Sequence, residues 1–74
     1  MPSAKVNNLI KMINQIAANI CFQSSEQEAV TKITTHLQLF WAKSMKQDII
    51  DYYRQDGEDL SELAGQAVAR LAGE

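Results

Sequence analysis

The sequence predicts an all-α protein, a small bundle of three to four amphipathic helices with short connections. Three observations lead to this fold class. Apolar residues recur at three- and four-residue steps along most of the chain, which is the spacing of one helix face. The only proline is Pro2, and the three glycines lie in the last eighteen residues, so long stretches carry no helix breaker. Serine and aspartate residues precede the apolar stretches at positions suited to helix caps.

The first two helices are expected over residues 4–22 and 26–41. Ser3 is a suitable N-cap for the first, and Ser25 with Glu28 three residues later forms a capping box for the second. The apolar stripe of the first helix comprises Val6, Leu9, Ile10, Ile13, Ile16, Ala17, Ile20 and Cys21. The stripe of the second comprises Val30, Ile33, Leu37, Phe40 and Trp41. Each helix therefore has one face to bury against its neighbours.

The third helix is expected over residues 45–56. Ser44 with Gln47 repeats the capping spacing, so we expect the chain to bend near residues 42–43, with a helix that continues through this point as the alternative. The stripe of this helix comprises Met45, Ile49, Tyr52 and Tyr53. Gly57 is well placed as the C′ residue that ends it.

The fourth helix is expected over residues 60–72, with Asp59 and Glu62 as the capping pair at its start. Its stripe comprises Leu60, Leu63, Ala64, Ala67, Val68 and Leu71. Connections of a few residues bring successive helices side by side. We therefore expect residues 1–74 to form a single helical domain.

Length and charge exclude several classes of protein. For 74 residues the hydrophobic gain of a core roughly equals the cost of ordering the chain. This balance argues against a self-contained enzyme and favours a compact helical unit, a subunit that depends on a partner, or both. Seven Lys+Arg against nine Asp+Glu give a net charge of −2, the wrong sign for a nucleic-acid-binding module. Residues 1–46 hold five lysines and two acids, whereas residues 47–74 hold two arginines and seven acids. This asymmetry fits a solvated surface and could also orient docking on another protein.

The cysteine count and the N-terminus indicate a cytoplasmic protein. Cys21 is the only cysteine, so there is no disulfide framework and a reducing compartment fits. Residues 1–8 lack the apolar run of a signal peptide, and no apolar stretch approaches the roughly 20 residues of a membrane span. We expect neither a membrane nor a nucleic acid as a partner.

No motif in the chain indicates catalysis or cofactor binding. There is no Gly-rich phosphate loop, and no Cys or His pair has metal-ligand spacing. His36, the only histidine, has no second His or paired carboxylates nearby in the sequence, so we expect a boundary histidine rather than a catalytic base. Cys21 lies on the first stripe and is expected to be buried.

Apolar residues outside the stripes indicate a protein-docking surface. Phe22 points nearly opposite the first stripe, and Leu39 nearly opposite the second. Phe40 and Trp41 are adjacent and about 100° apart on the helix, so we do not expect a small bundle to bury both rings. Because Trp and Tyr commonly anchor protein interfaces, we expect a docking surface that includes Trp41.

Three blocks of residues, spread over roughly residues 8–72, form a pattern of their own. The first is Leu9-Ile10-Lys11-Met12-Ile13-Asn14-Gln15-Ile16-Ala17. The second is His36-Leu37-Gln38-Leu39-Phe40-Trp41, followed by Met45. The third is Gly57, followed by Leu60, Leu63, Ala67, Val68 and Leu71. In order and spacing these blocks resemble the small delta subunit of cytoplasmic NAD-dependent, molybdenum-containing formate dehydrogenases.

The resemblance implies a non-catalytic accessory subunit. In that family the catalytic alpha subunit carries a molybdenum pterin cofactor and iron–sulfur clusters, and the delta subunit is associated with assembly, cofactor insertion and stability of the complex. We therefore expect the chain to bind no cofactor itself and to dock on the alpha subunit. The residues expected at a docking surface or structural seam are Asn14, Gln15, His36, Phe40, Trp41 and Met45. The alternative is a free-standing helical regulatory or self-associating domain, which would form a homodimer when isolated.

Overall fold

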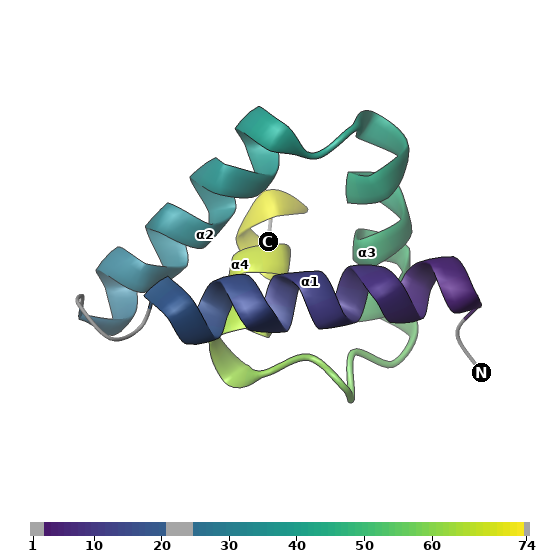
Figure 1. Cartoon of the computed structure of the whole chain (residues 1–74), viewed down its shortest axis with the longest axis horizontal. Helices are drawn as coiled ribbons and strands as arrows, with labels where there is room; N and C mark the ends of the chain where they lie inside the picture. Colours follow the sequence, from purple (N-terminus) through teal and green to yellow (C-terminus); the bar gives the residue numbers. More distant parts are fainter. Residues whose placement is uncertain (1–2, 21–24, 74) are drawn as a thin grey trace.

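The structure, a computed structural model, describes residues 3–20 and 25–73, and within these ranges it contains four helices and no strand (Figure 1). The helices are α1 (Ala4–Ile20), α2 (Glu26–Phe40), α3 (Lys43–Gln55) and α4 (Glu62–Leu71). The predicted all-α bundle is therefore confirmed. Cys21 and Phe22, which were expected at the end of the first helix, lie outside the described residues.

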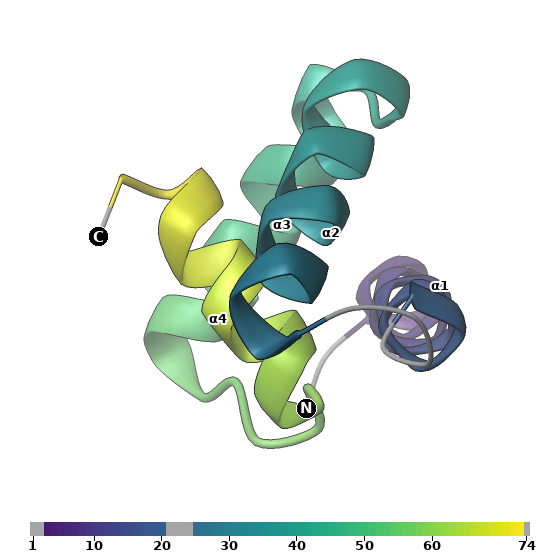
Figure 2. The ribbon, with the colours of Figure 1, turned by 90° about the vertical axis from the view of Figure 1, so that its left-hand side faces the viewer.

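The helices are arranged around one another rather than along a common axis. In Figure 1, α1 crosses in front, α2 and α3 rise on its two sides to a shared corner, and α4 lies behind. Figure 2, turned by 90°, shows α1 end-on, with α4 beside α2. The overall dimensions are 32 × 20 × 20 Å. The corner between α2 and α3 and the loop between α3 and α4 therefore lie at opposite ends of α3.

Each helix contributes a completely buried side chain to one shared core. Ile13, Ile33, Ile49 and Val68 come from α1, α2, α3 and α4 in that order, and all have no exposed surface. The remaining buried hydrophobic residues in the described part are Leu9, Ile10, Ala17, Ala29, Val30, Leu37, Trp41, Tyr52, Ala64 and Ala67. Nearly all of them lie on the predicted stripes, which explains why four short helices of this sequence assemble.

The two predicted N-caps in the first half of the chain are confirmed. The Val6 amide donates to Ser3 Oγ at 3.2 Å, and the Glu28 amide donates to Ser25 Oγ at 3.3 Å. Each serine oxygen satisfies one of the amides that a helix start leaves without a partner inside the helix.

The chain does break between α2 and α3, but the predicted cap of α3 is wrong. Trp41 and Ala42 are extended, with φ, ψ of −86°, 137° and −64°, 155°. Helix α3 then begins at Lys43, because the Ala42 carbonyl already accepts from the Lys46 amide at 3.0 Å. Ala42 is the N-cap and supplies no side-chain hydrogen bond. Ser44 therefore lies inside the helix instead of capping it.

Helix α3 ends as predicted at a glycine with positive φ. Gly57 has φ of +68°, and its amide donates to the Tyr52 carbonyl at 3.1 Å. This is the left-handed conformation that a C′ glycine adopts with little strain.

The predicted cap of the fourth helix, Asp59 with Glu62, is wrong. Helix α4 begins at Glu62, and its N-cap is Ser61, whose Oγ accepts from the Ala64 amide at 3.2 Å. Asp59 instead belongs to a loop held from two sides. Its amide donates to the Tyr52 hydroxyl at 3.0 Å, and its carbonyl accepts from Asn14 Nδ2 at 2.9 Å. These tertiary hydrogen bonds move the start of the helix two residues along the chain.

Candidate functional site

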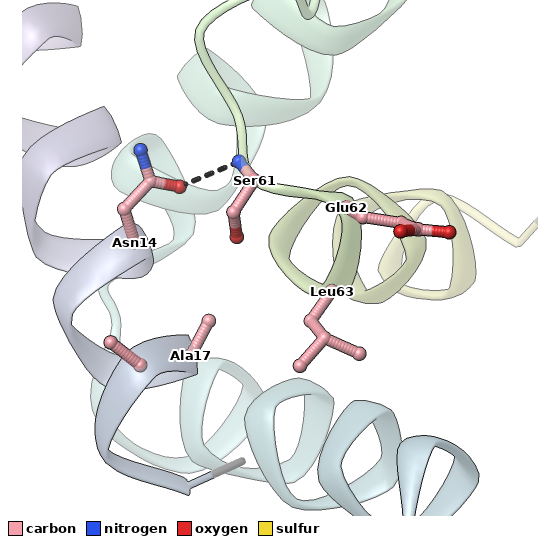
Figure 3. Close-up of a pocket in the computed structure, with 6 residues that line it drawn as sticks. Asn14, Ala17, Ser61, Glu62 and Leu63 are labelled. Carbon is pink, nitrogen blue, oxygen red and sulfur yellow. Dashed lines mark hydrogen bonds between the residues drawn. The ribbon is translucent and has the colours of Figure 1, made fainter.

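Asn14 connects α1 to the loop before α4. Its Nδ2 donates to the Asp59 carbonyl at 2.9 Å. Its Oδ1 accepts from the Ser61 amide, also at 2.9 Å (Figure 3). The side chain thereby bridges segments that lie 45 and 47 residues away in the sequence. Its neighbour Gln15 is exposed. Of this predicted pair, the structure gives Asn14 a structural role, that of a seam between α1 and the loop.

A small hollow lies beside this seam, between α1 and the start of α4. Its volume is about 200 Å³, and it is lined by Asn14, Ala17, Ala18, Ser61, Glu62 and Leu63. Figure 3 shows the Leu63 side chain pointing into the hollow near Ala17. The volume is below the roughly 300–1,000 Å³ of typical ligand pockets, and the walls are mainly apolar. We therefore interpret the hollow as a gap in the packing between α1 and α4, not as a ligand site.

His36 and Phe40 lie one turn apart on α2 and form an aromatic contact. Their ring centroids are 4.9 Å apart, and the ring planes are tilted by 44°. His36 is half-buried, whereas Phe40 is 71% exposed. Leu39, beside Phe40, is also 71% exposed, as its position opposite the stripe predicts. Together these three residues form an apolar and aromatic surface at the end of α2.

Trp41 lies in the core, in contrast to Phe40. It is only 6% exposed, and Met45 packs against the same cluster of buried residues. One ring of the adjacent pair is therefore buried and the other exposed. The exposed ring is Phe40, so burial leaves Trp41 no free face to offer a partner. The expectation that the docking surface includes Trp41 is therefore wrong, because the extended backbone at Trp41 turns its ring into the core. Docking through His36 and Phe40 stays a prediction.

The predicted site residues do not gather at one place. Asn14, on α1, contacts the loop between α3 and α4, whereas Phe40 lies at the corner between α2 and α3. The 13 residues of α3 separate these ends by roughly 20 Å along the helix. What the structure brings together at the corner is the end of α2 and the start of α3, where Lys43 and Lys46 occupy the first turn.

The apolar stripes in the sequence do not predict several polar contacts between α2 and α4. Thr34 is buried, and its hydroxyl donates to the Val30 carbonyl at 2.7 Å and lies 3.4 Å from the Ala67 carbonyl. Arg70 donates to Thr31 Oγ1 at 2.7 Å. Gln66 Nε2 donates to Glu26 Oε1, also at 2.7 Å. The sequence feature that could have indicated this interface is Thr34, a polar residue at a position of the apolar stripe of α2.

Within the described residues 3–20 and 25–73, the His, Asp and Glu side chains form no group of three or more that could hold a metal ion. No helix in these ranges is long and apolar enough to cross a bilayer.

Comparison with protein families identifies one relationship. Residues 8–68 match the model of the NADH-dependent formate dehydrogenase delta subunit FdsD. A comparison with curated proteins gives no match. A comparison with solved structures gives none either. The family match extends from α1 into α4 and includes both the Asn14 seam and the corner between α2 and α3. The chain therefore belongs to the family of delta subunits of NADH-dependent formate dehydrogenase.

Proposed function

We propose that the chain is a non-catalytic accessory subunit that docks on the catalytic alpha subunit of a formate dehydrogenase and supports its assembly, cofactor insertion or stability. The family match over residues 8–68 carries this proposal, because it covers most of the folded chain and names a subunit of that complex. The exposure of Leu39 and Phe40 supports docking, because large apolar side chains on a small protein are commonly buried against a partner.

The proposal assigns the redox chemistry to the partner subunits. The catalytic subunit is expected to carry the molybdenum pterin cofactor and iron–sulfur clusters, and the chain described here is expected to bind neither. The chain itself would then contribute binding to the catalytic subunit and no redox chemistry. It would hold the catalytic subunit in a state that accepts its cofactor, or stabilise the completed complex, in the cytoplasm.

Deletion of the gene for this chain tests the proposal. In a deletion strain we expect a lower yield of the formate dehydrogenase, or less molybdenum per catalytic subunit, together with slower formate-dependent reduction of NAD. Metal analysis of the purified complex separates the two roles. Less molybdenum per subunit at normal yield indicates cofactor insertion, and lower yield at normal molybdenum content indicates stabilisation.

The control is the same strain with the wild-type chain supplied from a plasmid, which should restore yield and molybdenum content. Normal yield, metal content and activity in the deletion strain would contradict the proposal. A chain that forms a stable homodimer by light scattering and never co-purifies with the catalytic subunit would instead favour a free-standing, self-associating domain.

A further inference from the structure

Leu39 and Phe40 are the two most exposed large apolar side chains in the described part of the chain. Both are 71% exposed, and Met12 follows at 44%. Phe40 continues the buried stripe of α2, yet the chain turns at Trp41, and the Trp41 ring occupies the core in its place. The half-buried His36 ring beside Phe40 extends the exposed apolar area. We call Leu39, Phe40, His36, Lys43 and Lys46 the corner surface.

The start of α3 contrasts with the starts of α2 and α4. Helices α2 and α4 begin with a serine cap and with acidic residues in the first turn, which favour the positive end of the helix dipole. Helix α3 begins with Ala42 as N-cap and with Lys43 and Lys46 in its first turn. Neither the alanine N-cap nor the two lysines in the first turn stabilise the helix. A departure from local stability rules is typical of residues that serve another purpose.

The basic charge of the corner is not balanced by acids of the adjoining segments. No Asp or Glu occurs from residue 29 to residue 47. The next acid along the chain, Asp48, is paired with Lys5 at 2.8 Å. Asp51, which accepts from Gln47 at 2.9 Å, keeps its charge but lies more than one turn beyond Lys46 on α3. Helix α1 contains no acid at all.

The acidic residues concentrate at the other end of α3. Asp56, Glu58, Asp59 and Glu62 lie in or next to the loop that joins α3 to α4, away from the corner (Figure 1). Among the described residues, charge is therefore polarised along α3, and the exposed Leu39 and Phe40 lie at the positive end.

We propose that the corner surface is the face that docks on the catalytic subunit, and that it fits an apolar pocket bordered by carboxylates. Leu39 and Phe40 would enter the pocket, where removal of their surface from water favours binding. Lys43 and Lys46 would face the acidic border, which speeds association and rejects basic surfaces. This inference rests on the proposed function and adds to it the surface used and the chemistry of the partner's site.

Binding of the chain to the catalytic complex purified from the deletion strain tests this inference. For the double variant Leu39→Ser/Phe40→Ser we expect affinity lower by roughly 10- to 100-fold, because central apolar anchors dominate interface energies. For Lys43→Glu/Lys46→Glu we expect association slower by roughly tenfold at low salt, with the difference shrinking as ionic strength rises. Surface plasmon resonance at two salt concentrations measures both effects.

Two control variants lie on α1. Met12→Ser removes an exposed apolar side chain, and Lys11→Glu reverses an exposed charge, both away from the corner surface. We expect both to bind like the wild-type chain. Circular dichroism establishes that all variants keep the helical content of the wild type.

A photo-crosslinking amino acid at position 39 identifies the partner's segment. We expect a crosslink to a segment of the catalytic subunit that contains acidic residues. Reversal of these acids to lysine should restore fast association of the Lys43→Glu/Lys46→Glu variant. A crosslink confined to basic or uncharged segments overturns the inference.

The outcomes separate the inference from the function on which it rests. If the wild-type chain does not bind the catalytic complex, the proposed function fails and the inference fails with it. If the wild type binds and the folded Leu39→Ser/Phe40→Ser variant binds equally well, the inference alone fails. If that variant abolishes only a homodimer seen by light scattering, the corner surface binds a second copy and the inference is again overturned.

Discussion

Asn14 holds together two segments that are far apart in the sequence. A single amide side chain supplies both a donor, to the Asp59 carbonyl, and an acceptor, for the Ser61 amide. These two backbone groups lie just before the start of α4, so Asn14 helps to hold that start against α1. An asparagine suits this role because its side chain carries both functions on one rigid plane.

Replacement of Asn14 by alanine should destabilise the chain by about 1–2 kcal/mol, because two hydrogen bonds are lost and the backbone groups of Asp59 and Ser61 lose their partners. Urea unfolding followed by circular dichroism measures the change in the free energy of unfolding. The matched control is Gln15→Ala on the same helix, which should change it by less than about 0.5 kcal/mol because Gln15 is exposed. Equal stability of the two variants would contradict the structural role of Asn14.

Gly57 and Gly65 differ in what their positions in the helices require. Gly57 ends α3 at φ of +68°, and a Cβ built there would lie 3.2 Å from the Tyr53 carbonyl oxygen. Gly65 lies inside α4, and a Cβ built there meets nothing within 4 Å. The same residue type is therefore required at one position and dispensable at the other.

We expect Gly57→Ala to destabilise the chain by about 1–2 kcal/mol, the cost of placing a residue with a Cβ in the left-handed conformation. Gly65→Ala should have the opposite sign and stabilise the chain by about 0.5–1 kcal/mol, because alanine loses less backbone entropy in a helix. Thermal unfolding of both variants beside the wild type measures the pair. A loss of stability in Gly65→Ala would contradict the open space around that position.

The helices themselves could be predicted from the sequence, because the 3.6-residue repeat of apolar residues is a local property. The caps of α3 and α4 could not. Ser44 and Asp59 have suitable side chains, but Asp59 is held in a loop by Tyr52 and Asn14, residues of other elements. A helix start is decided by these tertiary bonds as much as by the local sequence.

The sequence predicted a large aromatic side chain left outside the core at the end of α2, but it assigned this role to Trp41, which is buried. The sequence shows that Phe40 and Trp41 cannot both be buried, because they are adjacent on one helix. It does not show which ring is buried. That depends on the extended backbone at Trp41 and Ala42, which turns the Trp41 ring into the core and leaves Phe40 outside.

At the scale of the whole molecule, the core and the proposed docking surface consist of different residues. The core takes one fully buried side chain from every helix, whereas the corner surface consists of side chains that the core does not need. The distribution of charge along α3 follows the same division, because Asp56, Glu58, Asp59 and Glu62 lie at the end opposite the exposed Leu39 and Phe40. The surface can therefore change without loss of the fold.

This division predicts that the chain unfolds as one cooperative unit, a single domain over residues 1–74. Trp41 is the only tryptophan and belongs to the same core cluster as Ile13, Ile49 and Val68, so its fluorescence should change when this shared core is lost. In urea, fluorescence and circular dichroism should give one common midpoint, with a free energy of unfolding of about 3–5 kcal/mol for a core of this size. The Leu39→Ser/Phe40→Ser variant should keep that free energy within about 0.5 kcal/mol, since both side chains are 71% exposed. Two separate midpoints would instead show that one helix, such as α1, unfolds independently of the others.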